Sequence, residues 1–127
     1  MKNIAIFGST GSIGESTLNV IRENPNLFRV VTLVAGQNIE KLIKQINEFK
    51  PNNVYIIKKE NADILKSLYK NIKIFYGKDG IEEISKLIDF DIAVSALVGI
   101  AGLKPTYNMI KNGKDVALAN KEVLVTA

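Results

Sequence analysis

The sequence contains no cysteine and no histidine. Without cysteine it can have neither a disulfide framework nor thiolate chemistry. Without histidine it lacks the commonest metal ligand and the commonest general base near neutral pH. Any chemistry must therefore rest on lysine, carboxylate, tyrosine or serine side chains, or on a bound cofactor.

Long apolar runs and a targeting segment are also missing. No apolar run approaches the roughly 18 residues that span a bilayer, and the first residues lack the basic segment and apolar core of a secretory signal. We therefore expect a cytoplasmic protein that has no membrane partner. The 127 residues, 46% hydrophobic and 24% charged, are typical of one folded domain.

Arginine is scarce, so lysine supplies nearly all of the positive charge behind the formal net charge of +4. The lysines, Lys41 and Lys44 among them, are spread along the chain and are not clustered with aromatic residues. A nucleic-acid surface would combine a basic stripe with stacking rings. We therefore predict solvated lysines on helix surfaces and no nucleic-acid partner.

Short apolar runs alternate with amphipathic stretches along the whole chain. Strands are predicted at residues 3–7, 29–35, 53–57, 73–76, 91–95 and 115–119. Five segments of helical periodicity lie between them; the fourth carries Ile81, Ile84, Leu87 and Ile88, and the fifth Leu103, Tyr107 and Ile110. This alternation predicts an α/β, Rossmann-like doubly wound fold, with a mostly parallel sheet and helices on both faces.

The predicted fold makes residues 1–127 one domain. The chain reaches its last residue inside a new apolar segment, 123–126, without a stop signal. Because natural domains usually end in polar linkers, we expect this sequence to be the front piece of a longer protein.

The segment GSTGSIG places three glycines directly after the first strand. Gly8 would allow a tight turn, Gly11 would let a pyrophosphate approach the backbone, and Gly14 would allow close packing of the helix on the strand. Thr10 and Ser12 add hydroxyl donors. Because a strand precedes the motif and an amphipathic helix follows it, we predict dinucleotide binding. The alternative is that these are ordinary turn glycines.

The end of the second strand indicates which dinucleotide is bound. NAD-binding proteins usually carry an acid there to hold the ribose 2′-hydroxyl, but this chain reads Gly36-Gln37-Asn38. These residues could donate to a 2′-phosphate, and Asn38 could also cap the second helix. Glu40 lies inside that helix and is not counted as the ribose acid. NADP is favoured, although an arginine clamp is missing.

Two later loops are expected on the same rim of the sheet. The segment SALVGIAGL, residues 95–103, is rich in small residues that would let a flat ring lie close to the backbone. Asn120, Lys121 and Glu122 follow the sixth strand, where Lys121 could meet an anionic or carbonyl oxygen. The alternative for these three residues is a helix cap followed by surface charges.

Four segments, GSTGSIGESTLNVI, FRVVTLVAGQN, SALVGIAGLKPT and ALANKEVLVTA, resemble the amino-terminal part of the 1-deoxy-D-xylulose 5-phosphate reductoisomerase family. The resemblance covers residues 4–127. It implies conversion of that phosphosugar to 2-C-methyl-D-erythritol 4-phosphate in non-mevalonate isoprenoid biosynthesis. In the family, Mg²⁺ or Mn²⁺ supports a rearrangement of the carbon skeleton, and NADPH then delivers hydride to the resulting aldehyde.

The resemblance also assigns site residues. By position it implies that Thr10, Gly11, Ser12 and Ile13 contact the NADPH phosphates, that Gly36, Gln37 and Asn38 face the 2′-phosphate, that Asn120 and Glu122 touch the cofactor, and that Lys121 contacts the substrate. Some members carry a basic residue where Gln37 stands. The metal ligands and most of the substrate site lie beyond residue 127 in the family. The implied enzyme is a homodimer at full length, and this chain alone would be inactive.

Two other functions agree with the same turn. Semialdehyde dehydrogenases share a G-x-T-G-x-x-G turn, but they rely on cysteine chemistry, which this sequence cannot supply. A non-enzymatic module that senses a dinucleotide without reacting it would need only the turn and the second strand end.

Overall fold

The computed structural model describes residues 1–87, 89–95 and 115–118. In these ranges the strands are β1 (Lys2–Phe7), β2 (Phe28–Val34), β3 (Asn53–Ile56), β4 (Lys73–Tyr76), β5 (Ile92–Ser95) and β6 (Asp115–Leu118). The helices are α1 (Ser12–Glu23), α2 (Ile39–Phe49), α3 (Lys59–Leu68) and α4 (Gly77–Ser85). The predicted strand bounds are therefore correct to within one residue.

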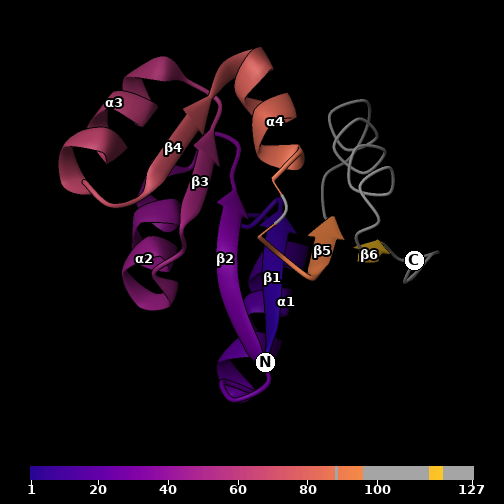
Figure 1. Cartoon of the computed structure of the whole chain (residues 1–127). Coiled ribbons are helices and arrows are strands. Elements are labelled where there is room, and N and C mark those ends of the chain that lie inside the picture. Colours follow the sequence, from indigo (N-terminus) through magenta and orange to yellow (C-terminus); the bar gives the residue numbers. More distant parts are fainter. Residues whose placement is uncertain (88, 96–114, 119–127) are drawn as a thin grey trace.

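The strands form a single sheet in the order β4-β3-β2-β1-β5-β6, and every neighbouring pair is parallel. The chain builds outward from β1 to β4, then returns to the other side of β1 to add β5 (Figure 1). The order therefore reverses between β1 and β5. In open α/β sheets ligands bind outside the carboxyl ends of the strands at this reversal.

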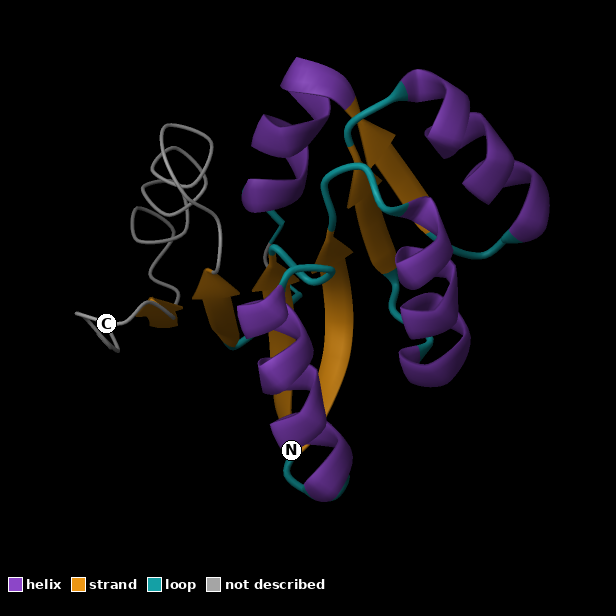
Figure 2. Ribbon diagram, turned by 180° about the vertical axis from the view of Figure 1, so that it is seen from behind, coloured by secondary structure: helices purple, strands orange, loops and turns teal. Residues whose placement is uncertain are grey.

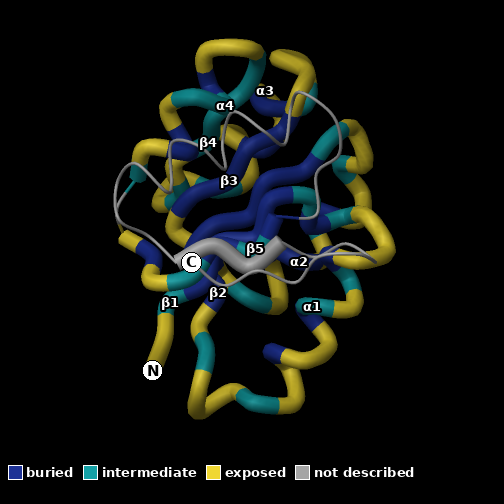
Figure 3. The backbone as a smooth tube through the Cα atoms, turned by 90° about the vertical axis from the view of Figure 1, so that its right-hand side faces the viewer, coloured by how far each residue is buried: buried dark blue, intermediate teal, exposed yellow. Residues whose placement is uncertain are grey.

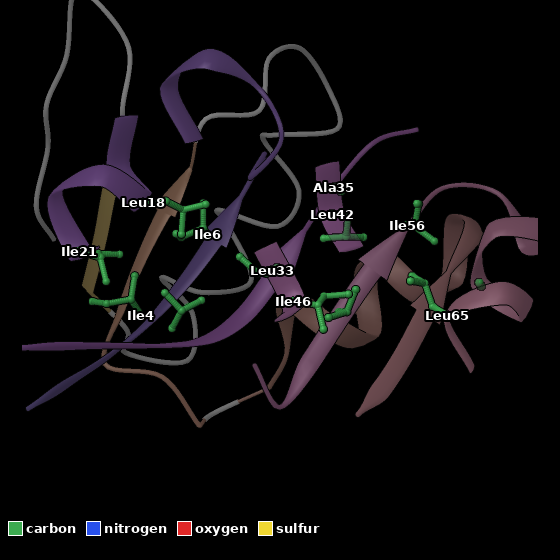
Figure 4. Close-up of a cluster of buried hydrophobic side chains, with 13 residues drawn as sticks. Ile4, Ile6, Leu18, Ile21, Leu33, Ala35, Leu42, Ile46, Ile56 and Leu65 are labelled. Atoms are coloured by element: carbon green, nitrogen blue, oxygen red, sulfur yellow. The ribbon is translucent and has the colours of Figure 1, made fainter. Parts of the chain in front are cut away.

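Helices cover both faces of the sheet, as the sequence predicts. Figure 2 shows α1 and α2 in front of the strands. Side chains of α1, α2 and α3 form one core cluster with the strands, and Leu18, Leu42 and Leu65 are its fully buried helix leucines. Figure 4 shows these side chains against Ile4, Ile6 and Leu33. Ile84 of α4 packs in a second cluster on the opposite face, with Phe7 and Val34.

The middle of the sheet is buried on both sides because of these two layers (Figure 3). All four residues of β3 are buried, as are the last four of β1 and the last five of β2. A strand buried on both faces reads as a continuous apolar run. The continuous apolar runs in the sequence therefore indicate that helices cover both faces of the sheet.

Helix α4 ends earlier than the predicted periodicity. It begins at Gly77 and ends at Ser85, so Leu87 follows the helix, and residue 88 lies outside the described ranges. The amide of Leu87 donates to the carbonyl of Ile84 in a closing turn, at 3.3 Å. Leu87 still packs on the second cluster. Its apolar character therefore reflects burial after the helix has ended, and not helical periodicity. The predicted fifth helix lies outside the described residues.

Candidate functional site

The turn between β1 and α1 is fixed by Gly8. Its φ of 99° lies in the left-handed region that favours glycine. The amides of Gly8 and Ser9 both donate to the carbonyl of Val34 at the end of β2, at 2.8 and 3.0 Å. The chain therefore bends sharply at the carboxyl end of the sheet, as the motif predicts.

Gly14 is required by packing within the same turn. A Cβ atom on Gly14 would lie 2.1 Å from the carbonyl oxygen of Gly8 and 2.7 Å from the Cα of Ser9. Gly14 is buried, and the first turn of α1 is pressed against the bend that precedes it. The predicted close approach is therefore present, and its contacts are with the turn residues.

Gly11 is different, because neither its backbone angles nor the described residues around it require a glycine. Its backbone angles, φ −79° and ψ 173°, suit any residue. Among the described residues, a Cβ atom would meet only the carbonyl oxygen of Gly8 within 4 Å, at an ordinary contact distance of 3.7 Å. The residue is exposed, so the missing side chain leaves bare main chain facing solvent.

Helix α1 begins at this bare main chain without a capping side chain. Among the described residues, the amides of Ser12 and Ile13 have no hydrogen-bond acceptor. Free amides at a helix start, together with the helix dipole, favour an anion. The hydroxyl of Ser12, on an exposed residue, adds a further donor. The predicted residues Thr10, Gly11, Ser12 and Ile13 therefore lie together around one helix start.

The β2–α2 junction lies beside this turn. The side chain of Asn38 accepts from the amide of Lys41 at 3.1 Å, so the predicted cap is present. Gln37 and Asn38 are exposed. In the part of the chain that the structure describes, a Cβ atom on Gly36 would meet only Ile57 Cδ1, at 3.9 Å, so packing there does not require this glycine either. Glu40 lies in the first turn of α2, which leaves the strand end without an acid.

Two side chains of α2 that the sequence did not single out reach the glycine turn. The amide nitrogen of buried Gln45 donates to the carbonyl of Ser9 at 2.9 Å and to the carboxylate of Glu15 at 2.6 Å. The ammonium of Lys41 lies 3.3 Å from the carbonyl oxygen of Thr10. The spacing of four residues puts both side chains on one helix face. The spacing of Lys41 and Gln45 in the sequence indicates that they share a face of α2. It does not indicate that this face contacts the glycine turn.

The remaining predicted site residues are only partly described. Phe7 pairs with Ser95, so the glycine turn starts beside the end of β5. Asn120, Lys121 and Glu122 lie outside the described residues. Within the described ranges, no group of three histidine, cysteine, aspartate or glutamate residues could hold a metal ion. In the same ranges, no helix is long and apolar enough to cross a membrane.

Comparison with known proteins gives one consistent result. Residues 4–127 match the profile of the 1-deoxy-D-xylulose 5-phosphate reductoisomerase family. Relatives of that name include those of Geotalea uraniireducens, 49% identical over 129 residues, and Thermoanaerobacter pseudethanolicus, 51% identical over 128 residues. Each match covers 100% of this chain and 33% of the relative. The chain thus spans about a third of the length of the curated relatives it matches.

Solved structures agree with the sequence matches. A crystal structure of DOX-P reductoisomerase in complex with NADPH, fosmidomycin and magnesium superposes with a TM-score of 0.87 at 36% identity, covering 96% of this chain and 31% of that one. The Zymomonas mobilis enzyme in complex with NADPH gives a TM-score of 0.84 at 32% identity, covering 95% and 32%. These matches favour the reductoisomerase resemblance over a semialdehyde dehydrogenase.

Proposed function

Because the chain belongs to the 1-deoxy-D-xylulose 5-phosphate reductoisomerase family, we propose that it is the NADPH-binding domain of such an enzyme. The observation that carries this proposal is Gly11. It is a glycine that neither backbone angles nor packing demand, and it stands at an uncapped helix start between residues with donor groups. Bare main chain at that place suits a pyrophosphate, which needs close access to amides.

The second strand end supports the phosphorylated dinucleotide. The exposed residues Gln37 and Asn38 stand where an NAD-binding protein would carry an acid. The cap uses the Asn38 oxygen and leaves its amide nitrogen as a donor. Gly36 leaves room beside them. These groups fit a 2′-phosphate and would not hold a free 2′-hydroxyl as a carboxylate does.

The proposed reaction of the whole protein follows from its family. It converts 1-deoxy-D-xylulose 5-phosphate to 2-C-methyl-D-erythritol 4-phosphate; when bound, the divalent metal supports the rearrangement and NADPH supplies the hydride. In this proposal Asn120 and Glu122 contact the cofactor and Lys121 the phosphosugar. The metal ligands belong to residues beyond 127, the working enzyme is a cytoplasmic homodimer, and residues 1–127 form its first domain.

Dinucleotide binding is tested by calorimetric titration of the full-length protein with NADPH and with NADH. We expect NADPH to bind more tightly. The substitution Gly11→Val places a side chain where the pyrophosphate is proposed to lie. Overpacking of this kind costs about 1–3 kcal/mol, so affinity for both dinucleotides should fall by about fivefold to a hundredfold.

The matched control is Lys58→Val, because Lys58 occupies the same position at the start of α3 and that helix also lacks a capping side chain. This control should leave both affinities unchanged. Undiminished binding by Gly11→Val, with an unaltered unfolding curve, would rule out the pyrophosphate position. A marked preference for NADH would contradict the assignment of the second strand end.

Catalysis is tested separately. With the phosphosugar, NADPH and Mn²⁺, the 127-residue chain alone should give no turnover above blank in a steady-state assay, because the proposed metal ligands are not part of it. Robust turnover by this chain would show that it contains a complete active site.

A further inference from the structure

Lys41 is a cation at the gap between the two junctions of the proposed cofactor site. Its backbone amide donates to Asn38 at the β2–α2 junction, 3.1 Å away. Its ammonium lies 3.3 Å from the carbonyl of Thr10 in the β1–α1 turn. One residue therefore contacts both of the segments between which a dinucleotide of this fold class places its adenosine ribose.

The orientation of the Lys41 side chain toward the glycine turn is supported by a second residue of α2. Gln45 lies four residues later on α2 and shares its helix face. Gln45 is buried and donates to the carbonyl of Ser9, one residue before Thr10. The helix phase therefore turns Lys41 toward the glycine turn, while its earlier position on α2 places it at the exposed end of that face.

The charge of Lys41 is not neutralised by a described carboxylate. The ion pairs among the described residues are Arg22 with Glu48 and Lys59 with Asp63. An ammonium has three donors, so its bond to Thr10 leaves two for another acceptor. No acid stands at the adjacent strand end, where Gly36, Gln37 and Asn38 follow Ala35. An unpaired cation at this position suits an anion that enters the gap.

We infer that Lys41 determines the preference for NADPH over NADH by binding the 2′-phosphate of the adenosine ribose. This inference rests on the proposed function and adds the cation that Gln37 does not provide. A 2′-phosphate carries about −1.5 to −2 charges at pH 7. The 2′-hydroxyl of NADH carries none, so Lys41 should discriminate between the two.

The test measures the dissociation constants of NADPH and NADH for the full-length wild-type protein and for its Lys41→Met variant. A hydrogen bond between an ammonium and a phosphate is about twice as strong as one between neutral groups. The NADPH dissociation constant should therefore rise roughly tenfold or more, while that of NADH changes less than about twofold. Lys41→Arg should keep most of the preference, because it keeps a charged donor.

Lys44→Met is the matched control, since Lys44 is an exposed lysine of the same helix without a hydrogen bond to the described part of the glycine turn. It should leave both constants unchanged. If Lys41→Met weakens both dinucleotides equally, Lys41 acts only by holding Thr10, and the inference is wrong. It is also wrong if NADPH binding is unchanged. If the unmodified protein binds neither dinucleotide, the proposed function itself fails, and the inference fails with it.

Discussion

The first and third strand-to-helix junctions begin alike and end in different surfaces. Both lie at the carboxyl edge of the same parallel sheet, and both α1 and α3 start without a capping side chain. At the first junction the N-cap residue is Gly11, whereas at the third it is Lys58, which is exposed and precedes Lys59 and Glu60. The two uncapped helix starts therefore present different surfaces, bare main chain at the first and a lysine side chain at the third.

What distinguishes the first junction is main chain that is both bare and held in place. Gly8 and Gly14 lock the bend, and Gln45 ties its carbonyl from α2. The third junction is tied by backbone bonds to its neighbours: Ile57 donates to Gly36 and accepts from Gly77. Glycines in this turn therefore have two different roles. Gly8 and Gly14 fix its conformation, whereas Gly11 leaves its main chain accessible.

The largest expected effect comes from Gly14→Ala. The new Cβ would lie 2.1 Å from the carbonyl oxygen of Gly8, and backbone cannot yield as a flexible side chain can. We expect a loss of about 3 kcal/mol or more in the free energy of unfolding, measured by denaturant titration. The third residue of α3 offers the matched change, Asn61→Ala, which should cost less than about 1 kcal/mol. Equal losses at the two junctions would erase the distinction between them.

A smaller effect is expected from Gln45→Leu. The substitution keeps the approximate size of the side chain but replaces its amide with an apolar group, which removes the donor to the buried carbonyl of Ser9 and to Glu15. An unsatisfied buried acceptor costs about 1–3 kcal/mol. Because the turn as a whole loosens, affinity for NADPH and for NADH should fall by the same factor in titration calorimetry.

The control for that change is Lys44→Leu on the same helix, which should alter neither stability nor affinity beyond about 0.5 kcal/mol. If Gln45→Leu lowered the affinity for NADPH but not for NADH, Gln45 would act on the 2′-phosphate. Its role would then not differ from the one inferred for Lys41.

The smallest effect is expected at the other end of α1. Arg22 pairs with Glu48 of α2, and its guanidinium lowers the pKa of that carboxyl below the ordinary value of 4.5. The pair is about half exposed, so Glu48→Gln should cost less than about 1 kcal/mol at pH 7. A depressed folded-state pKa gives stability that is present above 4.5 and is lost as pH falls through the folded value. Chemical denaturation across that range should show the wild type and the variant converging.

Glu23→Gln provides the control. Glu23 is the last residue of α1, next to Arg22, and it forms no ion pair with a described residue. It should show no such convergence. A cost at Glu48 comparable to that of Gly14→Ala would mean that the ion pair stabilises α1 as much as the glycine turn does, and would contradict this ranking.

The sequence predicts the fold because the relevant signals are local. A continuous apolar run marks each central strand, Gly8 supplies a positive φ at its own position, and Gly14 packs on Gly8, six residues earlier in the chain. The same holds for Asn38, whose cap bond spans three residues. Each of these can be inferred from a short window without knowing the tertiary structure.

The contacts that the sequence did not predict are long-range. Lys41 and Gln45 meet the glycine turn across 31 and 36 residues of chain. Nothing near a solvated-looking lysine indicates which loop will be packed beside it. The start of α4 is a second case: Gly77-Lys78-Asp79-Gly80 has the composition of a turn. It is helical in the structure, where a Cβ atom on Gly80 would lie 3.3 Å from Tyr55 Cε2, so the segment packs on a strand more than 20 residues earlier.

The strand order has a kinetic consequence. β1 to β4 are joined by successive short crossovers, but the seam between β1 and β5 closes only when Asp91 reaches Asn3, 88 residues away. Contacts so distant along the chain form late, because loop closure must precede them. In hydrogen-exchange experiments we expect the amides of the β1–β2 ladder to acquire protection before those of the β1–β5 ladder. The glycine turn between β1 and α1 would then be assembled while the other half of the sheet is still open.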